Sequence, residues 1–559
     1  MKNCFFFCIF FACFFTNQNA FYAQAGDFEW VKQAGSSGND QGLSIATDNN
    51  GNVYTTGCFE GSVDFDPGAS VNTLTSLGIL DVFIQKLDSD GNFVWAVRVG
   101  ANSNDAGVSL TTDTSGNIYV TGYFTGTVDF DPGINTYNLV SEGNIDVFIL
   151  KLNSNGDFAW ANRVGGTGLD QGSAIEIDAN NNIYTCGYFS DSVEFIQDTS
   201  SVNLSSYGSQ DVYIQKMDTD GNIMWVKQIG GIEQDVARGI AFDSNANVYI
   251  IGNFNNTVDF DPGIAAYNLT SVGNADVFIE KLDPNGNFIF AKQMGGPQND
   301  EGMSIQVDYQ DNIISIGNFQ SIADFNPGNQ TNELTSLGNS DIFILKLNSS
   351  GNFTWVKRIG AGSNERGLSV TLDQGGNIYT TGYFSMTVDF DPGTGTSFLT
   401  SVANFDGFIQ KLDSTGNFVF AKKFGNTDTD EVSDLSLDYI GNIYITGYFS
   451  MTVDFDPGTG THDLTSSGGR DIFTLKLSGT LGISDFEQTP LNVFPDPASD
   501  VLYITLNNDS NVTMLDVSGK LIQPLFLKEG TTGVDVSHLS PGIYFIQSIN
   551  TKTIRFIKQ

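Results

Sequence analysis

A pair of aspartates separated by one phenylalanine recurs along the chain and is the pattern best suited to chemistry. The motif Asp-Phe-Asp-Pro-Gly occurs five times, and its paired carboxylates are Asp64 and Asp66, Asp129 and Asp131, Asp259 and Asp261, Asp389 and Asp391, and Asp454 and Asp456. In an extended segment, residues two apart point the same way, so the two carboxylates of a pair converge. Converging carboxylates beside a turn could begin a calcium site, which needs about six to eight oxygen ligands.

The same motif also has a structural interpretation. Asp-Pro-Gly favours a tight turn, and Phe65 would then anchor the segment to the rest of the fold. A turn needs at most one aspartate, so the second carboxylate keeps the calcium hypothesis open. The runs Asp88–Asn92 and Asp218–Asn222 are explained by turn chemistry, because they lack the longer loop and closing glutamate of a helix-loop-helix calcium site.

Residues that could form a catalytic group are scarce. The chain has only two histidines, His462 and His538, and each stands alone without a serine elbow, a cysteine nucleophile or a phosphate-binding glycine loop nearby. Paired carboxylates can hydrolyse glycosides, but here the pairs recur unchanged, which favours structure or multivalent binding over one active site. Glu176 is different, because it is the only carboxylate at a position filled elsewhere by Ala46, Thr111, Ala241, Gln306, Thr371 and Ser436. It is therefore our candidate catalytic residue.

These residues belong to a repeat of 65 residues that occurs seven times without a gap. Equivalent positions are occupied by Gly51, Gly116, Asn181, Ala246, Asp311, Gly376 and Gly441. Each unit has four strand-like runs, and in the second unit these are 108–112, 118–124, 146–152 and 158–164. Four antiparallel strands joined by short turns predict one blade of an all-β, seven-bladed β-propeller.

The two ends of the repeat region predict how the ring closes. A copy of the fourth strand, at 28–33, precedes the first unit, whereas the last unit stops after its third strand at 471–477. We expect the N-terminal strand to complete the last blade, which removes open sheet edges. All five tryptophans share one position in the fourth strand, and we expect them to fill the gap between blades near the rim, at 30, 95, 160, 225 and 355.

Blade geometry also sorts the loops by face. The insertion between the second and third strands and the loop between blades both lie on one face of the propeller. The inter-blade loop supplies an acid in every unit, which predicts an acidic face that could add ligands to a calcium site: Asp40, Asp105, Asp170, Asp235, Asp300, Glu365 and Asp430.

Two resemblances to known families follow from these motifs. The run 113–122, continued after an insertion by 146–156, resembles the SBBP family of bacterial beta-propeller repeats over about residues 28–480. That resemblance implies a propeller without a shared reaction or ligand. The segments 492–499, 515–521, 539–544 and 553–558 resemble the C-terminal sorting domain of the type IX secretion system of the Bacteroidota, although Asp496 stands where that pattern usually has Asn. This second resemblance implies passage through the outer membrane, with the secretion machinery as a partner.

We therefore expect three parts: a signal peptide at 1–25, a propeller at 26–482 and a small C-terminal β-sandwich for sorting at 483–559. The net charge of -39 argues against nucleic-acid and membrane-surface binding, and no segment is long enough to cross a membrane. We predict a secreted or cell-surface monomer that binds a glycan or protein, assisted by calcium if the aspartate pairs hold it. The alternative is an extracellular polysaccharide hydrolase or lyase with its site in the mouth of the propeller.

Overall fold

The computed structural model describes residues 26–197, 200–479, 492–495, 497–506, 510–516, 521–528, 530–548 and 554–559. The predicted signal peptide, the boundary between residues 482 and 483, and Asp496 lie outside these ranges. The described part consists of strands and turns, and it contains no helix of the length and apolarity needed to cross a membrane.

The first repeat unit folds into one antiparallel sheet in the order β2 (Gln41–Thr47), β3 (Val53–Phe59), β6 (Asp81–Leu87) and β7 (Phe93–Val99). The insertion between β3 and β6 forms a short hairpin of β4 (Ser62–Asp64) and β5 (Thr73–Thr75). β3 and β6 are buried along their whole length, so each blade has its centre in its two middle strands.

The later units repeat this order. Their sheets are β8 (Ala106–Thr112), β9 (Ile118–Phe124), β12 (Asp146–Leu152) and β13 (Phe158–Gly166); β14 (Gln171–Ile177), β15 (Ile183–Gln197), β16 (Ser200–Met217) and β17 (Ile223–Ile229); β18 (Val236–Phe242), β19 (Val248–Phe254), β22 (Asp276–Leu282) and β23 (Phe288–Met294); β24 (Glu301–Val307), β25 (Ile313–Phe319), β28 (Asp341–Leu347) and β29 (Phe353–Ile359); and β30 (Arg366–Leu372), β31 (Ile378–Phe384), β34 (Asp406–Leu412) and β35 (Phe418–Phe424). Their insertion hairpins are β10 (Thr127–Asp129) with β11 (Asn138–Val140), β20 (Thr257–Asp259) with β21 (Asn268–Thr270), β26 (Ile322–Asp324) with β27 (Glu333–Thr335), and β32 (Thr387–Asp389) with β33 (Phe398–Thr400).

The seventh sheet is built from both ends of the repeat region. It runs β36 (Glu431–Leu437), β37 (Ile443–Phe449), β40 (Asp471–Leu477) and β1 (Phe28–Ala34), with the hairpin of β38 (Thr452–Asp454) and β39 (Asp463–Thr465) between β37 and β40. β1 pairs antiparallel with β40, so that Trp30 lies opposite Lys476 and Gln33 opposite Phe473. The N-terminal strand therefore completes the last blade, as the sequence predicts.

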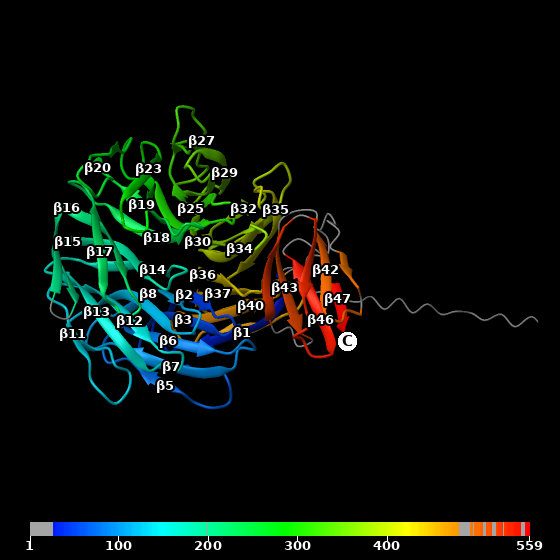
Figure 1. Ribbon diagram of the computed structural model, residues 1–559. Helices are drawn as coiled ribbons and strands as arrows, with labels where there is room; N and C mark the ends of the chain where they lie inside the picture. The colour runs from blue at the N-terminus through cyan, green and yellow to red at the C-terminus, as the bar shows by residue number, and fades with distance from the viewer. Residues whose placement is uncertain are drawn as a thin grey trace, which may run out of the picture.

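The innermost strands of the sheets meet in a closed ring. Each first strand contacts the first strand of the next sheet, in the order β2, β8, β14, β18, β24, β30 and β36, and β36 contacts β2. Figure 1 shows the sheets arranged around this centre from blue through green to yellow. The predicted all-β propeller is confirmed.

One blade departs from the pattern because its sequence does. The third insertion has lost the Asp-Phe-Asp-Pro-Gly motif, and β15 and β16 there continue as long paired strands instead of breaking into a separate hairpin. The proline of the motif lacks the backbone N–H that a ladder needs, so the first strand of each hairpin ends before it, whereas β15 continues to Gln197. β15 also pairs with β13, which joins the second and third blades in one sheet.

Aromatic side chains hold neighbouring blades together. The indole nitrogen of Trp95 donates a hydrogen bond to the carbonyl oxygen of Ser154 in the next blade at 3.2 Å. Its ring lies 6.3 Å from the ring of the buried Tyr54. Trp30, Trp160 and Trp225 make the same bond to the next blade. Each tryptophan thus packs between blades, the place that the sequence predicts for it.

The C-terminal segment forms two small sheets. One is ordered β41 (Asn492–Phe494), β42 (Val501–Leu506) and β45 (Gly530–Asp535), and the other β44 (Leu521–Leu527), β43 (Ser510–Asp516), β46 (Gly542–Ser548) and β47 (Ile554–Lys558). Ile504 of the first sheet and Val512 and Ile546 of the second belong to one buried apolar cluster. The predicted β-sandwich is confirmed.

Candidate functional site

The paired aspartates of the insertions cap their own turn. Oδ1 of Asp64 accepts hydrogen bonds from the backbone N–H groups of Asp66 at 3.1 Å and Asn72 at 2.8 Å. Oδ1 of Asp66 accepts one from Gly68 at 2.7 Å. The other four pairs make the equivalent bonds: Asp129 and Asp131, Asp259 and Asp261, Asp389 and Asp391, and Asp454 and Asp456. Both aspartates of a pair therefore serve the turn, where the sequence argument required only one.

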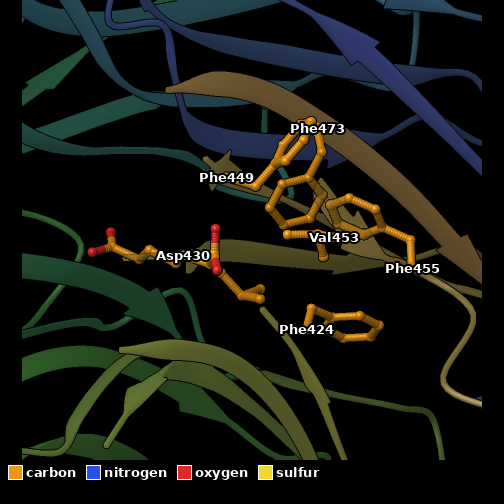
Figure 2. Close-up of a pocket in the computed structure, with 8 residues that line it drawn as sticks. Phe424, Asp430, Phe449, Val453, Phe455 and Phe473 are labelled. Carbon is orange, nitrogen blue, oxygen red and sulfur yellow. The ribbon is translucent and has the colours of Figure 1, made fainter. Parts of the chain in front are cut away.

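The phenylalanine between the two aspartates anchors the insertion. In the last insertion Phe455 is buried, with its ring 5.2 Å from that of Phe449 and 4.9 Å from that of Phe473. Figure 2 shows these rings beside Val453, with Asp430 to the left of them. The structural interpretation of the motif accounts for these contacts.

The calcium hypothesis for the ten aspartates stays a prediction. Within the described ranges, no group of three or more His, Cys, Asp or Glu side chains comes together in a way that could hold a metal ion. A calcium ion bound at an insertion would have to take oxygens from the second carboxylate atoms, backbone carbonyls and water.

The inter-blade acids do not lie on the surface of the insertion face, contrary to the expectation from sequence. All seven are buried, and the loop that carries each one wraps around its carboxylate. Asp300, for example, accepts backbone hydrogen bonds from Gly296 at 2.7 Å and from Gln320 at 3.1 Å. These acids tie the inter-blade loop to the end of the second strand, so they cannot join the insertion aspartates in a surface site.

Each inter-blade acid faces a second buried carboxylate, from the third strand of the preceding blade. Asp300 and Asp276 both come so close to Gly295 that a Cβ atom there would collide with the two carboxylates. Oδ2 of Asp276 accepts hydrogen bonds from Gln293 and Val272, whereas its buried Oδ1 has no hydrogen-bond partner. The seven pairs are Asp81 with Asp105, Asp146 with Asp170, Asp211 with Asp235, Asp276 with Asp300, Asp341 with Glu365, Asp406 with Asp430, and Asp471 with Asp40.

Burial dominates the chemistry of these pairs. Loss of solvent, together with the charge of Asp276, raises the pKa of Asp300 to about 8. Burial raises the pKa of Asp276 to about 6, although its hydrogen bonds act in the opposite sense. At neutral pH this pair therefore keeps a proton, because two adjacent buried carboxylates cannot both ionise cheaply.

The first strands of all seven blades line a central channel with a volume of about 390 Å³. Each of these strands has a β-bulge near its start, as between Gly42 and Ser44, and the extra residue lines the channel. A bulge redirects a side chain, so the channel presents residues that a regular strand would turn elsewhere.

Glu176 lies in this channel, as the sequence argument requires. Its Oε2 atom is 3.5 Å from the hydroxyl of Thr111 in the neighbouring blade. Burial raises the pKa of Glu176 to about 7, with a further contribution from the charge of Asp434. A carboxyl group with this pKa can give or take a proton near neutral pH.

Asp434 is a channel residue that the sequence argument missed. It bridges three blades, because Oδ1 accepts a hydrogen bond from Ser369 at 2.7 Å and Oδ2 accepts bonds from Ser44 at 3.0 Å and the backbone of Ile45 at 2.9 Å. The equivalent residues of the other units are small: Ser44, Ser109, Ala174, Gly239, Ser304 and Ser369. Asp434 is the only acid among these seven equivalent positions, a signal that the sequence alone contains.

A cluster of polar side chains breaks the repeat at the insertion-side mouth of the channel. Glu301 and Arg366, the first residues of β24 and β30, form an ion pair. Glu431, the first residue of β36, accepts a hydrogen bond from the hydroxyl of Tyr448 at 3.1 Å, and the guanidinium of Arg470 lies 4.3 Å from the centre of the Tyr448 ring. These five residues, together with Tyr383, are called the mouth cluster below.

Tyr383 joins the two halves of the mouth cluster. The charges of Arg366, Glu431 and Glu301 all act on its hydroxyl, whose pKa is raised chiefly by burial. At the position shared by Glu301, Arg366 and Glu431 the other four units have the uncharged residues Gln41, Ala106, Gln171 and Val236, whereas the position shared by Tyr383 and Tyr448 is also a tyrosine in two other blades. Because neither the turns nor the core of a blade needs these charges, the mouth cluster is the best candidate for a binding site.

Comparison with known families identifies both the repeats and the C-terminal segment. Residues 492–559 match the secretion system C-terminal sorting domain, and residues 29–57, 94–126 and 225–257 match the beta-propeller repeat of the SBBP type. The chain carries propeller repeats and a type IX sorting domain. That domain directs secretion to the cell surface or the extracellular space, and it implies interaction with the type IX machinery.

Similar proteins do not define a ligand. An uncharacterized WD repeat-containing protein of Acanthamoeba polyphaga mimivirus is 25% identical over 76% of this chain and 36% of its own length. The regulatory protein FlaEY of Caulobacter vibrioides is 23% identical over 63% of this chain and 37% of its own. This chain therefore spans little more than a third of the length of these relatives.

Solved structures show only distant likeness. Sqt1 from Chaetomium thermophilum aligns with 81% of this chain and 99% of its own, with 11% identity and a TM-score of 0.39. PorZ, an essential surface component of the type-IX secretion system of Porphyromonas gingivalis, aligns with 95% of this chain and 100% of its own, with 10% identity and a TM-score of 0.18. At these TM-scores neither structure carries an argument about this chain.

Proposed function

We propose that this secreted propeller is a binding protein that holds a glycan or protein ligand at the insertion-side mouth of its channel. The observation that carries the proposal is the break in symmetry at the mouth cluster. Four charged side chains that the remaining units lack, those of Glu301, Arg366, Glu431 and Arg470, meet there with two tyrosines on three adjacent blades, while the turns and core of the same blades keep the repeat.

The chemistry of the mouth cluster suits a hydroxylated ligand. Glu301 and Arg366 are each about one-third exposed, so they can exchange part of their ion pair for bonds to a ligand. Tyrosine offers a ring face and a hydroxyl together, and arginine and carboxylate groups fix orientation by hydrogen bonding. Sugars and peptide side chains both present the matching donors, acceptors and apolar edges.

A glycan array probed with the secreted chain, with and without a chelator, tests this function. The paired variant Glu301→Gln with Arg366→Gln removes both charges without leaving one of them unpaired. We expect it to lose binding, while Glu333→Gln on the exposed face of an insertion hairpin keeps it. Equal binding by both variants, with unchanged melting temperatures, would contradict the assignment of the site to the mouth.

A second function is favoured by one observation, the raised pKa of Glu176 inside the channel. A carboxyl group that titrates near pH 7 is suited to general acid or base catalysis, and Asp434 supplies a second carboxylate whose charge reaches it. The corresponding activity is hydrolysis or elimination on an extracellular polysaccharide.

Turnover of purified polysaccharides separates the two functions. If the chain is an enzyme using this site, Glu176→Gln abolishes product release, whereas Thr371→Ser at the equivalent position of another blade does not. Activity that survives Glu176→Gln would move the site elsewhere, and an absence of turnover on every polymer would leave binding as the function.

The organisation of the chain completes the proposal. We propose a signal peptide at 1–25, a propeller at 26–482 and a sorting domain at 483–559, with the secreted chain as a monomer. Mass spectrometry of the mature ends and light scattering of the purified protein test these statements. A start upstream of residue 26 or a stable dimer would contradict them.

A further inference from the structure

Arg238 stands out among the residues that line the channel. It occupies the bulge position of the fourth blade, where the other units have Leu43, Val108, Ser173, Met303, Leu368 and Ser433. It is therefore the only cation in a ring of small or apolar side chains. No turn, core contact or blade interface of the repeat requires a charge at this position.

The guanidinium of Arg238 lacks the carboxylate partner that four other arginines have. Arg98, Arg163, Arg358 and Arg366 each form an ion pair with a carboxylate. In contrast, the Nε–H group of Arg238 is buried without a hydrogen-bond partner, and its side chain has no ion pair within the described residues. An unpaired buried donor costs about 1–3 kcal/mol, so an arginine held in this way signals a ligand more readily than a structural role.

The surroundings of Arg238 point to the kind of ligand. Its charge acts on the hydroxyl of Tyr188, whose pKa is raised chiefly by burial, and that hydroxyl donates a hydrogen bond to Gln171 at 2.8 Å. A guanidinium group can grip a planar oxyanion such as a carboxylate in two places. The volume of about 390 Å³ falls within the range of small-molecule sites.

Charge limits the oxyanion to one that carries a single negative charge. The chain has a net charge of -39, and the channel also contains Glu176 and Asp434. Inorganic phosphate and phosphate monoesters, which carry close to two charges at neutral pH, would be repelled more strongly than one carboxylate attached to a neutral body. A sugar with a carboxylate at one carbon satisfies both conditions.

We propose that Arg238 anchors the carboxylate of a uronic acid residue that enters the channel from the insertion side. This inference rests on the proposed function, since it names the ligand class of the same mouth. The mouth cluster would contact the following sugars of an acidic polysaccharide, and Arg238 would bind the terminal residue.

Calorimetric titration of the whole secreted chain with glucuronate, galacturonate and their short oligomers tests the proposal. Glucose oligomers of equal length and inorganic phosphate serve as ligands without the matching charge. We expect uronates to bind at least tenfold more tightly than the neutral sugars or phosphate. Arg238→Gln should weaken uronate binding at least tenfold without changing the binding of neutral sugars, whereas Glu333→Gln, on the exposed face of an insertion hairpin, should not weaken it.

Two further readouts keep the test independent of folding. Arg238→Met should raise the melting temperature, because it removes the unpaired buried donor, and this change would not occur if Arg238 stabilised the fold. Arg238→Lys should bind uronate with intermediate affinity, since it keeps the charge but loses the two-point contact. Uronate binding that is absent, or that is the same in Arg238→Gln, overturns the inference. If the array still detects another ligand that depends on Glu301 and Arg366, the proposed function stands without it.

Discussion

Replacing Asp276 by asparagine should make the stability of the propeller less sensitive to a rise in pH from about 4 to about 8. Asp276 and Asp300 are both fully buried, and the unpartnered Oδ1 atom of Asp276 lies on the side that Asp300 approaches. An amide at this position can donate a hydrogen bond to the carboxylate of Asp300 while its oxygen still accepts bonds from Gln293 and Val272. The substitution therefore replaces a repulsion with an attraction and preserves the existing contacts.

The sign follows from the raised pKa of Asp276. Below the ordinary pKa of 3.8 the folded and unfolded chains both hold the proton, and there is no penalty. As the pH rises from 3.8 to about 6, only the folded chain keeps it, so the free energy of unfolding falls. The full penalty above pH 6 is about 3 kcal/mol, since one pKa unit corresponds to about 1.4 kcal/mol. Asp300 extends the same decline toward pH 8.

Thermal melting of the wild type and of Asp276→Asn at pH 4 and pH 8 measures the effect. We expect nearly equal melting temperatures at pH 4, and a melting temperature for the variant that is higher by a few degrees at pH 8. Glu333→Gln, which removes an exposed carboxylate from an insertion hairpin, controls for the change in net charge. If the melting temperatures of the wild type and of Asp276→Asn changed by the same amount between pH 4 and pH 8, the idea that this pair holds a proton would be refuted.

Three other outcomes test separate parts of the structure. If the insertions bind calcium, millimolar Ca²⁺ should raise the melting temperature, because a ligand at a hundredfold excess over Kd adds about 2.7 kcal/mol of stability. Asp66→Asn should reduce this gain, and an unchanged melting temperature of the wild type would contradict calcium binding. Trp95→Phe loses one hydrogen bond to the next blade, while Lys86 still donates a hydrogen bond to the carbonyl oxygen of Ser154. The free energy of unfolding measured with denaturant should therefore fall by about 0.5–1 kcal/mol. A fall of several kcal/mol would mean that the indole does more than bridge two blades. Removal of residues 492–559 should leave the folded propeller inside the outer membrane, as measured by cell fractionation, and normal export of the shortened chain would contradict the role of the tail.

The repeat made most of the fold predictable from sequence. A unit that recurs seven times reports the same strand and turn signals many times over, so errors in one copy are corrected by the others. For the same reason β9 and β12 have the bounds expected from the second unit. β8 begins earlier, at Ala106, because pairing with β9 extends past the bulge that disturbs its alternation.

The candidate site was harder to predict because it depends on where equivalent residues of different units lie in the folded propeller. The inter-blade acids look like a surface feature in sequence, since acids are seldom buried, and only the loop that wraps around Asp300 shows otherwise. Asp434 and Arg238 are visible as exceptions within their columns of equivalent positions. However, their functional role can be interpreted only once the channel is known, and the channel is formed by all seven blades together.

Because β1 pairs with β40, the last blade cannot be completed until both ends of the repeat region have been synthesised. Gln33 and Asp471, which hydrogen-bond at 2.6 Å, are separated by 438 positions, so one blade stays unfinished until almost the whole repeat region has emerged. Loop closure over such a span is slow relative to local hairpin formation. The ring therefore stays open during synthesis, and the first and last strands act as a latch that engages only after the final blade has arrived.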